Sequence, residues 1–525
     1  MILRANLAIR DKYVYWFLVS ALSVSIALQM FAFPWQMDEF IMFHTLACTQ
    51  SSQQLNIYRE ACLAYPISLG SLEYQRSYQY VGAISSILYA PFHWVLPYEW
   101  TNYFVGMIYL FGVVTGISKS FRLSRITTLI ITLAFPLSYG LIHDGGPVRL
   151  TALVIAWTPF ICNKAILSNK NLQVLTVFLS GIWVLATEDK PFFLFLIPGV
   201  WILTWASIMR NQNVTFLKAV KSTKVSLLFA TISSVTILLV LRVNSASYLS
   251  SLSGSASLWS NLKPDMRSLL LLFSWPQAAH RTSSPIPVTT SPDTMPIEIQ
   301  LRALIQQNPS LWLGYLFATL LTLILFVSLM LLWRRCSNDQ QKILMIIFFA
   351  TSAFFIGATV SGGWAIHHFL FVHLAFAIFT GLVIEYLKST RSLILGAIAL
   401  STAISLVFVL AAPAVYASGK DIDKALEFAY AHADPRDIIN CKDWGCYYKY
   451  SLLNRKNIPV VFGREESHMS NLSILVVEGK VRNIYHVCHF CSVLDAQYAY
   501  PGLTIQDKSF TSGDWKTFVF SAPIR

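Results

Sequence analysis

The chain has 525 residues, of which 55% are hydrophobic and 12% are charged. Soluble proteins carry roughly 25% charged residues, so this composition excludes an ordinary soluble domain and indicates a polytopic membrane protein. The net charge is +13. In a membrane protein this excess of Lys and Arg follows from the positive-inside rule and from contact with anionic lipids, so nucleic acid is not expected as a partner.

The first predicted element is a membrane span over Tyr13–Phe33, and Arg4, Arg10 and Lys12 precede it. About 20 apolar residues are enough to cross a bilayer, and this run ends without a small-residue cleavage site. We therefore expect an uncleaved signal anchor whose amino terminus lies in the cytoplasm.

Two adjacent carboxylates, Asp38 and Glu39, follow the first span directly. Acidic side chains are costly to bury at a membrane boundary, so the pair is either solvated or functional. A carboxylate fixed there can accept a proton from an acceptor hydroxyl while a lipid-linked donor lies in the same membrane. Asp is a weak base, with a pKa of about 4, but burial or the neighbouring Glu39 would raise that value. We predict Asp38 as the general base. Glu39 is predicted to assist it, to hold the acceptor, or to bind a divalent cation (Mg²⁺ or Mn²⁺), the one cofactor candidate.

Ten further apolar segments have the length of a span, which gives about eleven transmembrane helices. The segment Val81–Pro97 is apolar but short and contains Pro91. We interpret it as a re-entrant or interfacial helix, because this choice keeps the basic turn at Lys119 on the inner side. The other predicted spans are Trp100–Ser118, Ile126–Ile142, Thr151–Leu167, Leu172–Thr187, Pro191–Met209, Val225–Leu241, Leu311–Trp333, Ile343–Val360, Phe369–Leu387 and Leu393–Val415.

The chain is thus expected to have four parts. Residues 1–33 hold the amino terminus and the first span, and residues 34–99 form the first extracytoplasmic loop with juxtamembrane helices. Residues 100–415 form the transmembrane body, which includes a Ser- and Pro-rich extracytoplasmic loop at 244–309. Residues 416–525 form a small soluble α/β domain on the extracytoplasmic side.

Within this soluble domain the sequence predicts a helix over Asp421–Ala433, and strands over Leu472–Val477 and Thr517–Ser521. The predicted fold class is an α-helical polytopic membrane protein with a small α/β extracytoplasmic carboxy-terminal domain.

Six cysteines are predicted on the outer side, and an even number there favours disulfides. We expect Cys48 to pair with Cys62, and the four others to pair among themselves with the connectivity left open. A zinc site made by those four thiolates is the alternative. A thioredoxin-like role for a Cys-x-x-Cys pair is not expected, because the sequence gives no sign of a strand before it and a helix after it. The four others are Cys441, Cys446, Cys488 and Cys491.

The order of motifs resembles the GT-C superfamily of membrane glycosyltransferases, which includes the aminoarabinose transferases and the protein O-mannosyltransferases. The acidic pair after the first span matches the acidic motif of these proteins, and Tyr78–Pro97 looks like their juxtamembrane helix. The segment Thr187-Glu188-Asp189-Lys190-Pro191 is similar to their Thr-Lys-Gly-Pro turn, with an extra acidic residue and no Gly. Trp364–Phe369 lies where relatives often carry an Arg-Tyr pair, and has His instead.

Sugar transfer from a polyprenyl phosphate also needs cations for the leaving phosphate. The candidates are Arg149, Lys190, His367 and His368, all predicted on the outer side near span ends. Each of them can alternatively be an interfacial anchor or a solvated loop residue. Two smaller candidates for binding the acceptor or a metal are the pairs His143-Asp144 and Glu188-Asp189, and the first pair also fits a plain Gly-Gly turn.

The resemblance implies an inverting hexosyl- or pentosyltransferase that uses a polyprenyl-phosphate-linked sugar. Its expected location is the bacterial inner membrane, with the carboxy-terminal domain in the periplasm and a lipid, a glycan or a protein as acceptor. The alternatives are a transporter or flippase-like protein and a ligase or polymerase of the O-antigen type. A transporter needs ionisable residues at mid-membrane, and the predicted spans contain few.

Overall fold

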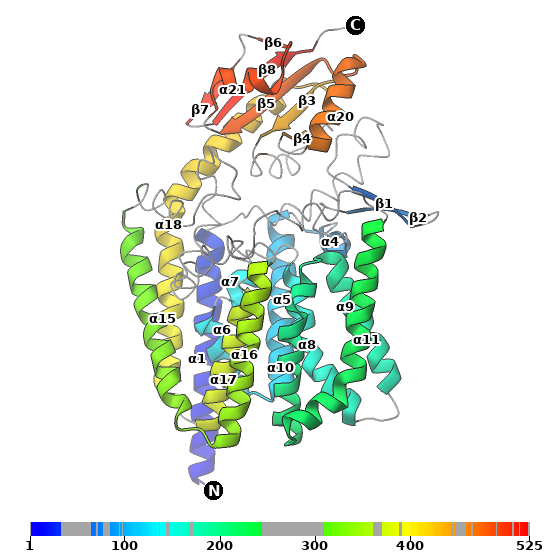
Figure 1. Ribbon diagram of the computed structural model, residues 1–525. Helices are drawn as coiled ribbons and strands as arrows, with labels where there is room; N and C mark the ends of the chain where they lie inside the picture. Colours follow the sequence, from blue (N-terminus) through cyan, green and yellow to red (C-terminus); the bar gives the residue numbers. More distant parts are fainter. Residues whose placement is uncertain are drawn as a thin grey trace.

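The computed structural model consists of a helical body and a sheet-containing tail (Figure 1). The residues that the structure describes are 2–32, 65–69, 72–76, 84–93, 95–96, 98–135, 137–142, 148–167, 172–243, 306, 309–360, 370–387, 391–442, 446, 458, 460–463, 466–489, 491–506, 509–513 and 515–522.

Each predicted span coincides with a helix, except one span that is formed by two shorter helices. Among the described residues, seven helices are long and apolar enough to cross a membrane by length and composition. The multi-pass helical architecture is therefore confirmed, while the number eleven stays a prediction. The helices of the body are α1 (Ile2–Ala32), α5 (Tyr98–Phe121), α6 (Arg125–Ala134), α7 (Leu137–Ile142), α8 (Val148–Leu167), α9 (Leu172–Asp189), α10 (Phe193–Gln212), α11 (Phe216–Val243), α15 (Leu311–Trp333), α16 (Asn338–Val360), α17 (Leu370–Leu387) and α18 (Arg391–His432).

Some helices of the body are buried in its core, and others expose apolar surface that suits contact with lipid. Most of α17 is buried, including Phe371 and Leu374. By contrast, α11 and α15 expose large apolar side chains such as Val225 and Ile324. Exposing such apolar surfaces to water is unfavourable, whereas contact with lipid tails is not. These two helices are therefore suited to the lipid-facing outside of a membrane-embedded bundle.

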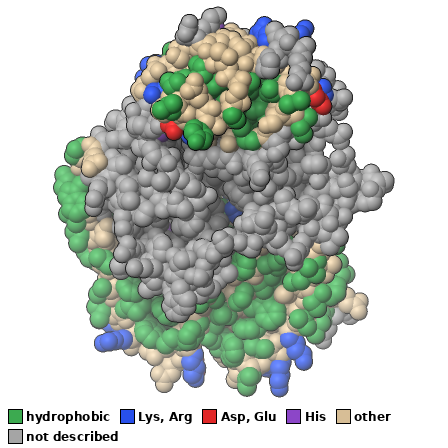
Figure 2. Space-filling model, turned by 45° about the horizontal axis from the view of Figure 1, so that its top comes forward, with side chains coloured by type: hydrophobic (Ala, Val, Ile, Leu, Met, Phe, Trp, Pro, Cys, Tyr) green, Lys and Arg blue, Asp and Glu red, His purple; other side chains and the backbone are tan. Residues whose placement is uncertain are grey.

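The two ends of the body differ in charge. Lys119, Lys164 and Arg210 lie in the last turns of α5, α8 and α10, at the same end as the amino terminus (Figure 1). Figure 2 shows Lys and Arg side chains along this lower rim of the apolar surface. We call this the basic end, and the opposite end, from which the tail rises, the tail end. The positive-inside rule assigns the basic end to the cytoplasm, which stays a prediction.

One predicted span is interrupted. Where the sequence predicts a continuous span over Ile126–Ile142, the structure has two short helices, α6 and α7. Phe135 caps α6 in an extended conformation, and Pro follows it in the sequence. A residue before proline is driven out of the helical region, and proline itself has no N–H to donate, so the helix restarts. The final carbonyls of α7 consequently lie at the tail end.

A short helix, α4 (Ile84–His93), lies at the tail end next to a hairpin of β1 (Tyr65–Leu69) and β2 (Leu72–Arg76) (Figure 1). The two strands pair antiparallel. Ten residues of helix are about 15 Å long, half of what a bilayer core requires. α4 therefore does not span, in agreement with the interpretation of Val81–Pro97 as a re-entrant or interfacial helix.

The tail is an α/β unit on the end of α18. Its strands run in the order β4-β3-β5-β8-β6, with β7 paired to β8. β3 is parallel to β4 and β5, whereas β8 is antiparallel to β5. The elements are β3 (Ile438–Cys441), β4 (Val460–Phe462), α20 (Glu466–Val477), β5 (Asn483–His489), α21 (Val493–Ala499), β6 (Thr504–Ile505), β7 (Phe510–Ser512) and β8 (Trp515–Ser521).

Two expectations about the tail need correction. Leu472–Val477, predicted as a strand, forms the end of α20. Leu472 and Leu475 are buried while Ile474 is exposed, which is the three-residue spacing of a helix. The domain boundary placed after residue 415 falls inside α18, and the helix predicted over Asp421–Ala433 is present as the last part of α18, which ends at His432.

α18 is packed directly against the tail sheet. The hydroxyl of Thr517 donates to the carbonyl of Ala425 over 3.1 Å, and the hydroxyl of Ser512 donates to Asp421 over 2.8 Å. The rings of Phe428 and Phe510 stack with centroids 5.0 Å apart. The last membrane helix and the tail therefore form one packed unit.

In the tail, disulfides join Cys441 to Cys446 and Cys488 to Cys491. Sulfur atoms in disulfides are not available as thiolate ligands, so this pairing leaves no four-thiolate zinc site. The Cys-x-x-Cys pair does lie between a strand, β5, and a helix, α21, an order that the sequence did not reveal. Both of its cysteines are buried, which blocks attack by a partner thiol, so this disulfide serves the structure. Cys48 and Cys62 lie outside the described residues.

The core of the tail contains a buried polar cluster. The Nδ1 atom of His486 lies 3.3 Å from the hydroxyl of Tyr500, to which the side-chain amide of Asn440 donates. Burial lowers the pKa of His486 to about 3, with a further contribution from the charge of Lys442. The imidazole is therefore neutral in the folded tail.

This burial predicts an acid-sensitive tail. The unfolded chain binds a proton near pH 6.5 and the folded chain only near pH 3, so stability is complete above pH 6.5 and falls as the pH decreases toward 3. We expect a loss of about 2 kcal/mol between pH 7 and pH 5. Hydrogen exchange of β5, corrected for the intrinsic pH dependence of exchange, measures it. His486→Gln should remove most of this slope, and an unchanged slope in that variant contradicts the assignment.

Candidate functional site

The candidate site lies at the tail end of the body, beneath α4. Four of the predicted site residues are described there, namely Arg149, Glu188, Asp189 and Lys190, and all four are buried. Among the described part of the body, these are the buried Asp, Glu, Lys and Arg side chains. Burial of charge is expensive without partners, so the partners of each group indicate what it does.

Asp189 holds the beginning of α4. One of its carboxylate oxygens accepts the backbone N–H of Ser85 over 2.9 Å, and the other accepts the Ser85 hydroxyl over 2.8 Å. Ser85 is the second residue of α4, so its N–H has no carbonyl partner within the helix. A negative charge at this position also complements the helix dipole. The last residue of α9 thus caps α4 from outside.

Arg149 joins three other helices to α8. Its Nε and Nη2 atoms donate to the carbonyls of Leu141 and Ile142, over 2.6 and 2.7 Å, and these are the last two residues of α7. Its Nη1 atom donates to the side-chain oxygen of Asn102 on α5 over 2.7 Å, and also to the hydroxyl of Tyr89 on α4. One buried guanidinium therefore satisfies the end of α7 and fixes α4 and α5 to it.

These two charged groups hold the same face of α4. Ser85 and Tyr89 are four residues apart, so they lie one above the other on the helix, and both are buried. Ile87 and Leu88 are exposed on another side. A helix with one face bound to the protein and apolar side chains on another is suited to lie along the membrane surface.

A glycine makes this arrangement possible. A Cβ atom at Gly106 on α5 would lie 2.8 Å from both the carbonyl oxygen of Leu141 and the Cα of Ile142. Any larger residue there would push α5 away from the end of α7. Asn102 lies one turn earlier on α5, and this close approach brings it within reach of Arg149.

The turn between α9 and α10 carries the remaining groups. The N–H of Lys190 donates to the carbonyl of Ala186, and the N–H of Phe193 donates to the carbonyl of Lys190, both over 2.9 Å. Glu188, Asp189 and Lys190 are therefore consecutive buried residues where α9 ends. The site as described holds two cations and two carboxylates, so its charges are balanced in the absence of a ligand.

The other predicted site residues lie outside the described residues. They are Asp38, Glu39, His143, Asp144, His367 and His368. Within the described part of the chain, no three His, Cys, Asp or Glu side chains are arranged to hold a metal ion. A divalent cation thus stays a prediction that depends on the acidic pair after α1.

Sequence reasoning missed Ser85, Tyr89 and Asn102. The signal that was available is the spacing of Ser85 and Tyr89 inside an apolar segment, which places two polar groups on one helix face. Their partners could not be inferred, because Ser85 and Asp189 are separated by 104 positions.

The contact between Asp189 and Ser85 predicts a local effect. Ser85→Ala deletes one hydrogen bond to a buried carboxylate, which costs about 1.5–3 kcal/mol. We expect the amides of α4 to exchange hydrogen roughly tenfold to a hundredfold faster, as mass spectrometry of α4 peptides would show. Ser352→Ala is the matched control, because that hydroxyl bonds only within α16, to Phe348. Unchanged exchange in α4, or an equal change in the control, contradicts the capping role.

No protein-family model matches the chain, and no curated protein matches it in sequence. Two solved structures are similar in fold. One is ArnT from Cupriavidus metallidurans bound to undecaprenyl phosphate, with a TM-score of 0.54 and 9% identity, covering 97% of this chain and 98% of that chain. The other is the same protein in the apo state, with a TM-score of 0.53 and 10% identity over the same shares.

The similarity extends over the body and the tail together, because almost the whole length of each chain is covered. At such low identity it bears on the fold and not on the activity. The fold expected from the order of motifs is confirmed at this level: the chain has the fold of ArnT.

Proposed function

We propose that the chain is a membrane glycosyltransferase that transfers a sugar from a polyprenyl-phosphate donor to an acceptor at the tail end of its body. One observation carries this proposal: the chain shares its fold, over 97% of its length, with ArnT, which has been solved with undecaprenyl phosphate bound. A polyprenyl phosphate needs an apolar bundle for its chain and polar groups at the boundary for its phosphate, and the described site has this combination.

The proposed reaction is a single displacement. The oxygen of the acceptor hydroxyl attacks the anomeric carbon of the sugar, and the bond between that carbon and the phosphate oxygen breaks. The bonding electron pair leaves with the polyprenyl phosphate, and the hydroxyl proton passes to Asp38. One displacement inverts the anomeric configuration, so we propose an inverting hexosyl- or pentosyltransferase. Its acceptor is a lipid, a glycan or a protein.

The acidic pair supplies the base in this proposal. Asp38 follows Ala32, the last residue of α1, by six positions, and α1 ends at the tail end (Figure 1). The chain order therefore supports a base at the same end as α4. Glu39 would hold the acceptor or bind a divalent cation, for which Mg²⁺ and Mn²⁺ remain the candidates.

Cations at the tail end would stabilise the leaving phosphate. We assign the phosphate contact to Lys190, with His367 and His368, which precede α17 in the sequence, beside it. Arg149 donates to four protein groups, so we assign it to holding α4 and to supplying a fixed positive charge. Asp189 positions α4, while Glu188 and the pair His143-Asp144 are assigned to the acceptor or a metal.

The distribution of charge favours a membrane glycosyltransferase over a transporter. Among the described residues of the body, the buried Asp, Glu, Lys and Arg side chains gather at the tail end. Transporters bind their substrates near the bilayer midplane with polar or ionisable groups at that depth. We therefore propose interfacial chemistry, in a bacterial inner membrane with the tail in the periplasm.

The proposal predicts that Asp38→Asn abolishes transfer. The change keeps the shape of the side chain and removes the base, so activity should fall by about 10²–10⁴-fold. Transfer of radiolabelled sugar from polyprenyl-phosphate donors in membranes, with expression matched, measures it. Full activity in the variant would remove Asp38 from this role. If no donor supports transfer and solute or lipid movement is detected instead, the transport alternative replaces the proposal.

A second prediction concerns the leaving phosphate. Lys190→Gln keeps most of the side-chain length and removes the charge, so transfer should fall by about 10²–10³-fold, as for the loss of one stabilising donor. Lys342→Gln is the matched control, because Lys342 is exposed at the basic end and pairs only with Asp339. The assignment fails if both variants transfer sugar as fast as the wild type.

A further inference from the structure

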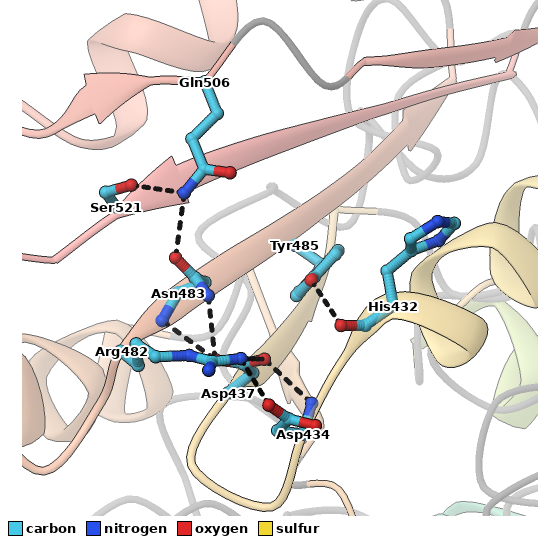
Figure 3. A network of polar contacts seen from close by, with 8 residues as sticks. All are labelled: His432, Asp434, Asp437, Arg482, Asn483, Tyr485, Gln506 and Ser521. Atoms are coloured by element: carbon cyan, nitrogen blue, oxygen red, sulfur yellow. Dashed lines mark hydrogen bonds and ion pairs between the residues drawn. The ribbon is translucent and has the colours of Figure 1, made fainter.

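A second polar site lies on the tail. A groove with a volume of about 420 Å³ opens at the edge where α18 meets β5, β6 and β8. This volume lies within the range of about 300–1,000 Å³ that is usual for ligand pockets. Figure 3 shows its polar groups. Its lining includes Phe428, His432, Arg482, Asn483, Gln506 and Ser521.

The groove is remote from the candidate active site. His432, which lines it, is the last residue of α18. The predicted span ends at Val415, and the 17 residues from there to His432 correspond to about 25 Å of helix. Chemistry at the membrane boundary and binding in the groove therefore take place at separate points of the molecule.

The charged floor of the groove consists of one guanidinium and two carboxylates. The Nη2 atom of Arg482 donates to Asp434 over 2.5 Å and to Asp437 over 3.1 Å, and its Nε atom donates to the other oxygen of Asp437 over 3.2 Å. Asp437 is fully buried, so its charge is not screened by water. Two carboxylates face one guanidinium, so this cluster carries a net negative charge and repels an anionic ligand. The oxygens of Asp437 already accept from Arg482 and Asn483, so they are not open to a cation. The chemistry of the floor favours a neutral ligand.

A chain of hydrogen bonds fixes the amides of the groove. The side-chain amide of Asn483 donates to Asp437, and its oxygen accepts from Gln506, both over 3.1 Å. The same Gln506 nitrogen donates to the Ser521 hydroxyl over 2.5 Å. Both hydrogens of that nitrogen are used, so the Gln506 oxygen is presented as an acceptor; in Figure 3 it points away from Ser521. The Ser521 hydroxyl accepts here and keeps its own proton to donate.

Aromatic rings form the wall on the α18 side. The ring centroids of Phe428 and His432 lie 4.5 Å apart, and the ring of Phe510 stacks on that of Phe428. The Nδ1 atom of His432 lies 2.8 Å from the carbonyl of Phe428, which can only accept, so Nδ1 carries the hydrogen. In the neutral ring, Nε2 is then an acceptor. His432 is exposed, so this acceptor is accessible.

We propose that this groove is a binding site for a neutral saccharide. Sugar hydroxyls both donate and accept, which matches preoriented acceptors on Gln506 and His432 beside donors on Ser521 and Arg482. The C–H faces of a sugar ring pack against aromatic rings, which the α18 wall supplies. The net negative charge of the floor disfavours phosphates and carboxylates. This site goes beyond the proposed transfer reaction and does not depend on it.

Saccharide binding to the full-length protein in lipid nanodiscs, which carry no sugar headgroups, tests the proposal. Maltotriose, chitotriose and a mannobiose would be titrated by saturation-transfer NMR. Inorganic phosphate is the anionic probe, and its binding would be followed by broadening of its ³¹P resonance. We expect at least one saccharide to bind and Gln506→Ala to weaken its affinity by tenfold or more. Gln497→Ala is the matched control, because Gln497 is exposed on α21, away from the groove, and should bind as the wild type does.

Three results would overturn the proposal. They are no saccharide binding up to ~10 mM, ten times the ~1 mM affinity of a weak site; equal weakening by Gln506→Ala and Gln497→Ala; and binding of phosphate in place of the saccharides. If Gln506→Ala does not fold, His432→Ala replaces it, because that side chain is exposed. Asp38→Asn should bind saccharides normally, so a failure of the proposed reaction is distinguished from a failure of this site.

Discussion

The charged side chains buried at the tail end of the body need hydrogen-bond partners, and this need determines how the helices around them are arranged. Asp189 and Arg149 are buried and no longer hydrated. Their hydrogen bonds come largely from helix ends and from α4. Removing a partner would leave a charge buried and unsatisfied, which is among the most destabilising changes in a protein. Near the basic end, the partly exposed Glu385 on α17 likewise accepts the N–H of Ser124, the N-cap of α6, over 2.8 Å. Helix ends in the body are thus bound by charged side chains of neighbouring helices.

This constraint joins the fold to the proposed chemistry. The restart of the helix after Phe135 produces the free carbonyls that Arg149 binds, and Gly106 lets α5 approach them. α4 is then fixed at the boundary by its contacts with Asp189 and Arg149 and is not free to move along the membrane surface. Transfer between two bound reactants depends on holding them within about an ångström of the productive geometry. A rigid helix at the boundary offers such a fixed surface, while a solvated loop does not.

Much of the fold was predictable from the sequence, because apolar runs long enough to span must form helices in lipid. The segment Leu311–Trp333 has the same bounds in sequence and structure, and α4 was expected as a short interfacial helix. The predictions that were wrong or missing concern contacts between distant parts of the chain, which no local sequence pattern indicates. The apolar run Leu472–Val477 is compatible with a strand or a helix, and only its packing in the tail shows that it is helical. The role of Ser85 depends on a carboxylate far along the chain, so a polar residue in an apolar segment could be noticed but not explained.

The continuity of α18 has a consequence for how the two proposed sites relate. One helix runs from the basic end through the body and into the tail, and its last turns pack on β7 and β8. The tail is therefore held at a set distance from the membrane and does not swing on a linker. A saccharide chain bound in the groove would be tethered about 25 Å of helix away from the boundary. Tethering raises the effective concentration of a long acceptor at the membrane site only if the acceptor can span that distance, since a linker that is too short contributes nothing. The length of α18 would thus select extended acceptors over short ones, by geometry and without any contact to the reacting hydroxyl.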